Sequence, residues 1–591
     1  MNNNNAGTYD LIVVGAGLAG LTAGVRAAEL GLRALVLEKG DGSDYPCNSR
    51  MSGGILHIGF HDPFRPPGEL RDLIDRLTDG QATPGQASAL SVTGARLIDW
   101  LQARGARFMR FNPQEAYRWC MSPPRALRAG NDWKDRGPDQ ILRKLAQDLV
   151  NLGATLQLRA QATGLLLENG ACVGIAGEAD GVQRQWRARH VILADGGFQS
   201  NRALYEQHIG ANFDAVFQRG ARTGTGSGLQ MAVAAGAALA GTDRFYGHVL
   251  CADSRQNDNV WPYPEIDAIA TAGIVVNQAG ERVVDEGVNG VFLANSLATL
   301  PGKHTFHAVF DQTIWDGPGT SARIPANPLL EKAGGTVLRA DSIEALAGLM
   351  GIDPGALGRT LQDYDAAVRD DALDRLPVQR SQKVKPHRIA QAPFMAIPVC
   401  PGITYTMGGI AINEHAEVLN ASGAPIAGLL AAGATTGGLE GGRNVAYIGG
   451  LMKAGSFGLI AAERVAALEG RTGQATIAAS TQSLSARSTA AQPAPAAQPN
   501  GASQSPSAES AARPPAHGIA RFPVLRATLR FGKPVAILLA VVVFCLTAWL
   551  AAPALGGVAF ILALVLGGVT AGIALGYVEL IRLITEFLMP E

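Results

Sequence analysis

Three glycines near the start of the chain and one glutamate beyond them have the types and spacing needed to bind a dinucleotide. Gly15, Gly17 and Gly20 follow the pattern G-x-G-x-x-G, and Glu38 lies 23 residues after the first of them. Such glycines let the backbone approach a pyrophosphate, and a helix that begins there offers free N–H groups and a positive dipole end. A carboxylate at the end of the next strand can accept hydrogen bonds from a ribose diol. The alternative, a glycine-rich turn that binds nothing, leaves the acid unexplained.

A strand–helix–strand pattern surrounds these residues and must position them. Residues 11–14 form an apolar run suited to one buried parallel strand, residues 23–30 predict a helix, and residues 34–37 predict a second strand. Residues 165–175 then read as a hairpin around an Asn-Gly turn, and residues 190–193 as a strand that enters a Gly-Gly turn. This order predicts an α/β domain of the Rossmann type with a small antiparallel excursion.

The composition narrows the class of protein. The chain has 591 residues, with 50 Lys+Arg and 50 Asp+Glu, so its net charge is zero. Because nucleic-acid binding needs a basic face, we expect no nucleic-acid partner. The six cysteines are scattered and form no C-x-x-C pair. With no cluster of histidine, cysteine and carboxylate in the sequence, we expect no metal site.

Four further motifs carry a resemblance to a known family. They are residues 223–236 (TGTGSGLQMAVAAG), residues 402–410 (GITYTMGGI), residues 426–438 (IAGLLAAGATTGG) and a predicted helix over residues 449–463. In this order, and together with the first glycine motif, they resemble the FAD-dependent oxidoreductases related to the fumarate reductase and succinate dehydrogenase flavoproteins. That family also includes 3-ketosteroid dehydrogenases and tricarballylate dehydrogenases.

The resemblance implies a GR-type Rossmann domain that binds FAD, formed by residues 7–246 and 404–470, with an α+β capping domain inserted at residues 247–403. Relatives with covalent flavin use a histidine that residues 42–56 lack, so we expect non-covalent FAD. The residues expected to bind FAD are Gly15, Ala16, Gly17, Leu18, Ala19, Gly20, Glu38, Lys39, Asn48, Ser49, Ser52, Gly53, Gly54, Ala162, Ala194, Asp195, Gly196, Thr225, Ser227, Gly408, Gly433, Ala434, Gly450 and Leu451.

The resemblance fails at the family's proton donor. In this family a hydride passes between flavin and substrate while a side chain handles a proton at the neighbouring carbon. Soluble fumarate reductases use an arginine, and by counting along the segment GERVVDE that position is Gly290. A substrate-binding histidine before the TMGG segment is replaced by Tyr405. Since ketosteroid-type dehydrogenases use a tyrosine beside the flavin, Tyr405 is the first candidate for acid or base; the alternative is a packing tyrosine.

Two further side chains are candidates through the same resemblance. His248 matches a substrate-holding histidine at the start of the cap, and Arg443 lies near the family's carboxylate-binding arginine. Their alternatives are a structural histidine and a surface arginine in a glycine-rich loop. Weaker candidates are Tyr246, Tyr263 and Tyr447.

The C-terminal part of the chain has a different character. Residues 471–518 are rich in Ala, Ser, Pro and Gln, which predicts a disordered linker. Within residues 519–591, segments 535–552 and 558–578 have 18 and 21 uncharged residues, enough for each to cross a bilayer. The alternative is a pair of buried helices. Basic residues precede the first segment, and the start of the chain lacks an export signal, so we expect the catalytic part in the cytoplasm.

These observations predict a membrane-tethered FAD-dependent dehydrogenase that acts on a CH–CH bond of a carboxylic acid or ketone. Its partners would be a small-molecule substrate, the lipid bilayer of the cytoplasmic membrane, and a quinone or membrane electron-transfer protein. One alternative is a reductase of enoates such as fumarate that uses a proton donor other than arginine. Another is a flavin-binding membrane sensor or scaffold without catalysis.

Overall fold

The structure is a computed structural model that describes residues 8–109, 115–302 and 305–471, together with six isolated positions between 543 and 570. The chain separates into two compact units. The first holds the described residues up to Ala106 and from Glu115 to Arg471, and it contains every feature discussed below except β4 and the predicted membrane segments.

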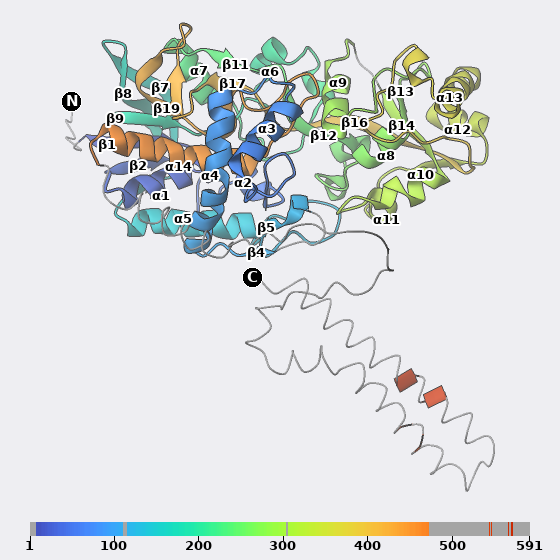
Figure 1. The fold of residues 1–591 in the computed structure, drawn as a ribbon, viewed down its shortest axis with the longest axis horizontal. Coiled ribbons are helices and arrows are strands. Elements are labelled where there is room, and N and C mark those ends of the chain that lie inside the picture. The colour runs from blue at the N-terminus through green and yellow to red at the C-terminus, as the bar shows by residue number, and fades with distance from the viewer. Residues whose placement is uncertain are drawn as a thin grey trace, which may run out of the picture. The chain divides into compact units, whose positions relative to one another are not determined.

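A mixed sheet forms the first half of this unit (Figure 1). Its strands, in spatial order, are β18 (Glu417–Leu419), β19 (Pro425–Ala431), β9 (Val182–Leu193), β1 (Tyr9–Val14), β2 (Ala34–Leu37) and β6 (Thr155–Gln157). The strands from β19 to β6 run parallel, and β7 (Ala160–Glu168) and β8 (Ala171–Ala179) form an antiparallel meander with β9. Leu11, Ile12 and Val13 of β1 are fully buried, as expected for a central parallel strand. The predicted Rossmann-type domain is confirmed.

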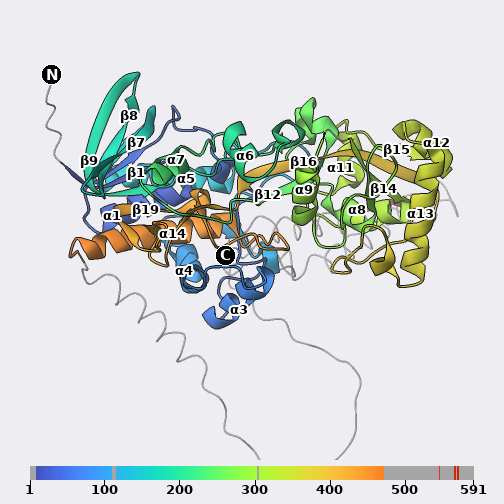
Figure 2. The same ribbon diagram turned by 90° about the horizontal axis from the view of Figure 1, so that it is seen from above.

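Helices cover this sheet (Figures 1 and 2). Those that pack directly on it are α1 (Leu18–Glu29), α5 (Gly137–Asn151), α7 (Ser227–Ala234) and α14 (Gly450–Leu468). Helix α4 (Pro84–Ala103) packs on α14, and α3 (Pro67–Leu77) packs on α4. Helix α1 begins at Leu18, earlier than the predicted residue 23, although glycine is a poor helix former. Glycine is accommodated in the helices here because the backbones approach closely. A Cβ on Gly20 would lie 1.8 Å from the carbonyl oxygen of Gly15, and a Cβ on Gly458 of α14 would lie 2.5 Å from the carbonyl oxygen of Ala19.

The second half is built around one long strand, β16 (Phe394–Thr406). It pairs antiparallel with β12 (Phe245–Cys251), β14 (Phe306–Asp311) and β15 (Leu338–Ala340), and parallel with β10 (Phe217–Gln218); β13 (Ile274–Val276) pairs with β14. The helices here are α8 (Asp267–Ala272), α9 (Gly290–Thr299), α10 (Gln312–Asp316), α11 (Ala326–Lys332), α12 (Ile343–Met350) and α13 (Pro354–Arg369). The expected cap limits, residues 247 and 403, fall inside β12 and β16, the strands that run between the halves (Figure 2).

Short elements complete the fold. They are α2 (Asn48–Met51), β3 (Ile55–Leu56), β4 (Phe108–Met109), β5 (Trp119–Met121), α6 (Arg202–His208), β11 (Leu239–Ala240), β17 (Gly409–Ala411) and β20 (Thr436–Gly437).

The predicted membrane segments, 535–552 and 558–578, and the predicted linker, 471–518, lie almost entirely outside the described residues. Within the part of the chain that the structure describes, no helix combines the length and the apolar character required to span a bilayer.

Candidate functional site

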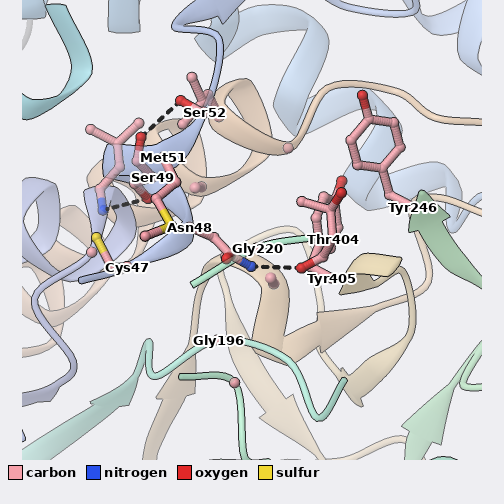
Figure 3. A pocket seen from close by; sticks show the side chains of 18 of the residues that line it. Cys47, Asn48, Ser49, Met51, Ser52, Gly196, Gly220, Tyr246, Thr404 and Tyr405 are labelled. Carbon is pink, nitrogen blue, oxygen red and sulfur yellow. Dashed lines mark hydrogen bonds between the residues drawn. The ribbon is translucent and has the colours of Figure 1, made fainter. Parts of the chain in front are cut away.

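A cavity of about 410 Å³ extends from the carboxyl ends of β1 and β2 to the start of β12. At the sheet, Gly15, Gly17 and Glu38 line it; at the second half of the molecule, Tyr246 and His248 do. Figure 3 shows that residues of α2, of the loop after β10 and of β16 also meet around it. The cavity therefore joins the predicted nucleotide loop to the predicted substrate residues.

Glu38 holds the nucleotide loop in shape. Its Oε2 accepts a hydrogen bond from the Ala16 N–H at 2.8 Å, and its Oε1 accepts one from the Gly40 N–H at 2.8 Å. The Leu18 N–H at the start of α1 donates to Oγ of Ser49 at 3.1 Å. The carboxylate and the helix N-terminus thus lie together at the cavity wall, as binding of a ribose and a pyrophosphate requires.

The backbone at this end leaves room for a ligand. A Cβ built on Gly196 would meet no atom within 4 Å, and one on Gly17 would meet only Oγ of Ser49, at 3.5 Å. Both glycines line the cavity. The residues present therefore fit a dinucleotide whose phosphates pass close to the main chain.

Asn48 connects three segments beside this space. Its side-chain amide donates to the carbonyl oxygen of Thr404 at 2.8 Å and accepts from the Ala221 N–H at 2.8 Å (Figure 3). Residues of α2, β16 and the loop after β10 are thereby fixed to one another, although they are far apart in sequence.

Most of the predicted FAD residues line the cavity; the exceptions are Ala16, Gly20, Thr225 and Gly408. Two of these have a packing role, because a Cβ on Gly20 or Gly408 would lie within 2 Å of a backbone carbonyl oxygen. Ala16 acts through its N–H to Glu38, and the hydroxyl of Thr225 lies 3.2 Å from that of Ser227.

Comparison with known proteins identifies the family and the cofactor of this chain. Residues 10–446 match the sequence profile of a family described as "FAD binding domain". The chain belongs to this family. It is a flavoprotein, an FAD-dependent oxidoreductase of the class that acts on CH–CH bonds, and the prediction of FAD is confirmed.

Individual relatives of the flavoprotein are distant. It is 26% identical over 451 residues to a probable fumarate reductase, Ifc3, of Shewanella frigidimarina, covering 73% of this chain and 71% of that protein. It is 28% identical over 373 residues to a 3-oxosteroid 1-dehydrogenase of Mycobacterium tuberculosis, covering 56% of this chain and 63% of that one. The structure of 3-ketosteroid Δ1-dehydrogenase from Sterolibacterium denitrificans superposes with a TM-score of 0.62 at 21% identity, over 78% of this chain and all of that one, which shows a shared fold.

The predicted acid or base, Tyr405, is held in a buried network. Its hydroxyl donates to the carboxylate of Glu440 at 3.0 and 3.1 Å, and that carboxylate lies 3.0 Å from Nζ of Lys453. All three side chains are buried. Burial, reinforced by the negative charge of Glu440, raises the pKa of Tyr405 well above its ordinary value. The phenolic proton of the flavoprotein's Tyr405, which lines the cavity, is therefore retained and directed at Glu440.

A second tyrosine, Tyr246, faces the cavity in a different setting. Its ring stacks on that of Tyr447, with centroids 3.9 Å apart and planes at 17°, and its centroid lies 5.5 Å from that of Tyr405. The Tyr246 hydroxyl lies 2.9 Å from Nε2 of His248. Tyr246, named from sequence as a weaker candidate, is thus the tyrosine whose hydroxyl lies beside a histidine.

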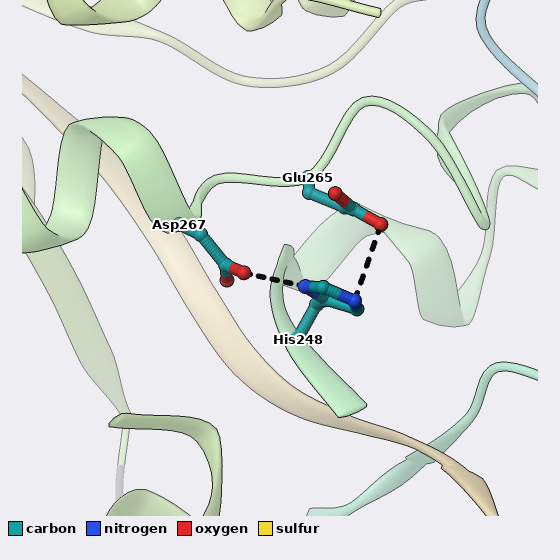
Figure 4. A group of neighbouring side chains, drawn as sticks. All are labelled: His248, Glu265 and Asp267. Atoms are coloured by element: carbon teal, nitrogen blue, oxygen red, sulfur yellow. Dashed lines mark hydrogen bonds and ion pairs between the residues drawn. The ribbon is translucent and has the colours of Figure 1, made fainter. Parts of the chain in front are cut away.

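His248 lies at the centre of a polar group (Figure 4). Its Nδ1 is 2.5 Å from Oδ2 of Asp267, and its Nε2 is 3.4 Å from Oε1 of Glu265. Arg219, buried beneath, forms an ion pair with Glu265 and donates to Oγ1 of Thr404 at 3.1 Å. Sequence reasoning missed both acids, because the turn before α8 brings them to β12 from 17 and 19 residues away.

His248, Glu265 and Asp267 are also possible metal ligands, although the sequence predicts no metal site. Ligand atoms of His248, Glu265 and Asp267 lie within 4.8 Å of one another, which is close enough to surround one ion. No spacing in the sequence signals this group, since only the fold of β12 and α8 assembles it. Its members already bond to one another, to Tyr246 and to Arg219.

Two other positions named from the sequence, Arg443 and Gly290, lie in different surroundings. Arg443 is exposed and is not among the residues that line the cavity, so we assign it no part in the chemistry. Gly290, where a fumarate reductase would have its arginine, is the first residue of α9. A Cβ there would lie 2.2 Å from the carboxyl group of Asp267, which fills the space that a side chain would need.

Proposed function

We propose that the flavoprotein is a dehydrogenase that removes hydrogen from two adjacent carbons of a ketone or carboxylic acid. The observation that carries this proposal is the exchange at position 290. No side chain projects from Gly290, and Asp267 occupies its surroundings and bonds to His248. The site therefore lacks the arginine acid of a fumarate reductase and instead places a carboxylate-supported base at the cavity.

The cofactor is held non-covalently by the residues around the nucleotide loop in this proposal. Glu38 would accept hydrogen bonds from the ribose and the start of α1 would face the pyrophosphate, while Asn48 and Ser49 fix the segments beside them. When bound, FAD supplies the acceptor for the hydride that leaves one of the two carbons.

The walls of the substrate end favour a flat, largely apolar molecule with one polar end. Aromatic side chains line it, namely Phe60, Tyr117, Tyr246, Tyr263 and Tyr447. The centroids of His57 and Phe60 lie 4.6 Å apart in a stacked pair that adds to this surface. Aromatic faces pack well against planar ligands, and hydroxyl groups at their edges can bind a carbonyl or carboxyl oxygen.

An anaerobic flavin assay tests the direction of the reaction. The purified flavoprotein is mixed with a panel of saturated ketones and acids, and loss of the oxidised flavin absorbance is followed. We expect bleaching by at least one ketone or acid. Absence of bleaching by every member, together with rapid reoxidation of the reduced flavin by an enoate, would refute dehydrogenation.

Reduction of an unsaturated acid is the second candidate. It is favoured by the similarity to a probable fumarate reductase and by Arg125, Arg219 and Arg323, which line the cavity and could attract a carboxylate. Arg219 is already paired with Glu265, which weakens this candidate. The reoxidation arm of the same assay separates the two directions.

We further propose that residues 535–552 and 558–578 anchor the flavoprotein in the cytoplasmic membrane, with the FAD domain on the cytoplasmic side. Their length and lack of charge support this, as do the basic residues before them. The linker would keep the enzyme close to a membrane electron acceptor such as a quinone. Deleting residues 472–591 should lower quinone-linked turnover much more than dye-linked turnover, and equal losses would refute the tether.

A further inference from the structure

We propose that Tyr246, His248 and Asp267 form a proton relay, with Tyr246 as the group that exchanges a proton with the substrate carbon. The inference rests on the proposed function, because it supplies the proton chemistry of that CH–CH oxidation. The proposal places the proton-exchanging group on strand β12, at the start of the second half of the fold, and not on α9 or at Tyr405.

A backbone hydrogen bond fixes the carboxylate of Asp267 beside His248. Its Oδ1 accepts a hydrogen bond from the Val249 N–H at 2.7 Å, which leaves Oδ2 aimed at Nδ1 of His248 at 2.5 Å. A carboxylate accepts only, so Nδ1 must carry the proton in this contact. In the neutral imidazole Nε2 is then the unprotonated nitrogen, and the hydrogen bond at 2.9 Å runs from the Tyr246 hydroxyl to it.

Tyr246 needs such a partner. It lines the cavity, and burial next to Tyr447 raises its pKa well above the ordinary value for a tyrosine. A phenol in this setting does not ionise alone, but it can pass its proton on as it receives another. A hydroxyl group, a base and an orienting carboxylate are arranged here as in catalytic triads, with the phenol in place of a serine or thiol.

The step balances as follows for a substrate held against Tyr246. The C–H bond beside the carbonyl breaks, its proton passes to Oη of Tyr246, and the phenolic proton passes to Nε2 of His248. The electron pair left on that carbon becomes the second bond of the C=C product as a hydride leaves the neighbouring carbon. Two electrons leave with that hydride to the FAD, and the imidazolium is stabilised by Asp267.

The surrounding charges favour a proton relay over a metal site. Glu265 is the third possible ligand, but it is paired with the buried Arg219, whose positive charge would repel a cation. His248 would also have to give up its bonds to Asp267 and Tyr246. The same Glu265 lies 3.4 Å from Nε2 and adds negative charge where the imidazolium forms.

The test compares rates of flavin reduction in rapid mixing. We expect Tyr246→Phe and His248→Gln each to lower the rate constant by about 10²–10⁴-fold, as for a lost acid or base, with FAD content and flavin spectrum unchanged. Asp267→Asn should lower it as well and alter its pH profile, and Asp267→Asn combined with His248→Gln should cost little more than His248→Gln alone.

Tyr205→Phe is the matched control. Tyr205 is fully buried outside the cavity, and among the described residues its hydroxyl has no hydrogen-bond partner, so the rate should not change. A Tyr246→Phe variant that keeps more than half of the wild-type rate would overturn the relay. So would activity that is lost in EDTA and restored by zinc.

The relay and the proposed direction can fail separately. If the wild type oxidises no ketone or acid but its reduced flavin is reoxidised by an enone or enoate, dehydrogenation is refuted. The relay must then donate the proton, so the same variants should slow reoxidation by the same factor, and unchanged reoxidation would overturn it. A wild type that reacts in neither direction overturns both proposals.

Discussion

Replacing Lys453 by methionine should destabilise the flavoprotein strongly, although the residue contributes no predicted contact to a substrate. Lys453 is 1% exposed and lies in the first turns of α14. Its Nζ is 3.0 Å from Oε2 of Glu440, whose side chain is fully buried. Methionine keeps most of the volume but leaves the carboxylate without its counter-charge.

The magnitude follows from what remains around Glu440. Removing one partner of a buried ion pair costs about 3–5 kcal/mol, because the other charge stays buried and uncompensated. Here the carboxylate still accepts hydrogen bonds from the Tyr405 hydroxyl and from the N–H groups of Ile448, at 3.1 Å, and Gly449, at 3.2 Å. These donors keep the cost at the lower end, about 3 kcal/mol. At about 2 °C per kcal/mol for a large domain, the melting temperature should fall by about 6 °C.

The assay is thermal melting at a fixed excess of FAD, because bound ligand shifts the melting temperature. Lys134→Met serves as the control: it removes an exposed pair with Asp44, 3.2 Å apart, and should change the melting temperature by less than about 2 °C. Lys453→Met combined with Glu440→Gln should recover most of the loss, since no unpaired charge remains. A double variant no more stable than Lys453→Met, or a single variant that melts like the control, would refute the reasoning.

Three other substitutions, at Glu38, Gly290 and His57, test the environment of single residues. Glu38→Gln keeps one acceptor oxygen for two N–H donors, so FAD affinity should fall by about 10–100-fold, measured by flavin retained on desalting. Gly290→Ala should cost about 1–3 kcal/mol through its clash with Asp267, whereas Gly348→Ala, in an open exposed helical position, should not destabilise; urea midpoints compare them. Burial lowers the pKa of His57 to about 4, and the unfolded value is about 6.5, so unfolding takes up a proton between these values. Stability should therefore fall by up to about 3 kcal/mol as pH drops through that window, and His57→Asn should flatten this slope of the urea midpoint.

The cofactor end of the site could be predicted because its chemistry is local. A pyrophosphate site needs glycines at fixed spacing within one strand–turn–helix, and Glu38 ends the very next strand. In the structure Glu38 lies beside the glycine loop and accepts hydrogen bonds from the N–H groups of Ala16 and Gly40. Helix propensity predicts a later start for α1, because glycine destabilises a helix. In the structure Gly20 lies inside α1, where the absence of a side chain allows close contact with Gly15.

The substrate end could not be predicted in the same way because its partners come from separate elements. Tyr405 was the first candidate for acid or base, but Glu440, 35 residues further along, receives its proton. His248 was expected to hold substrate, and nothing in its neighbourhood in the sequence points to Asp267 as its partner. Arg443 was chosen by alignment to a loop whose local path leaves that side chain exposed.

One substitution connects these differences. A glycine at position 290 gives up the side chain that fumarate reductases use, and the vacated volume is filled by Asp267 from α8 rather than left open. Asp267 cannot occupy that volume beside an arginine side chain, and without Asp267 Nδ1 of His248 loses this hydrogen-bond partner. The two features therefore depend on each other: Gly290 makes room for the acid that orients His248, and His248 in turn places a base against Tyr246. The proposed relay thus places the proton chemistry on strand β12 rather than at the start of α9, while the glycine loop keeps the G-x-G-x-x-G pattern.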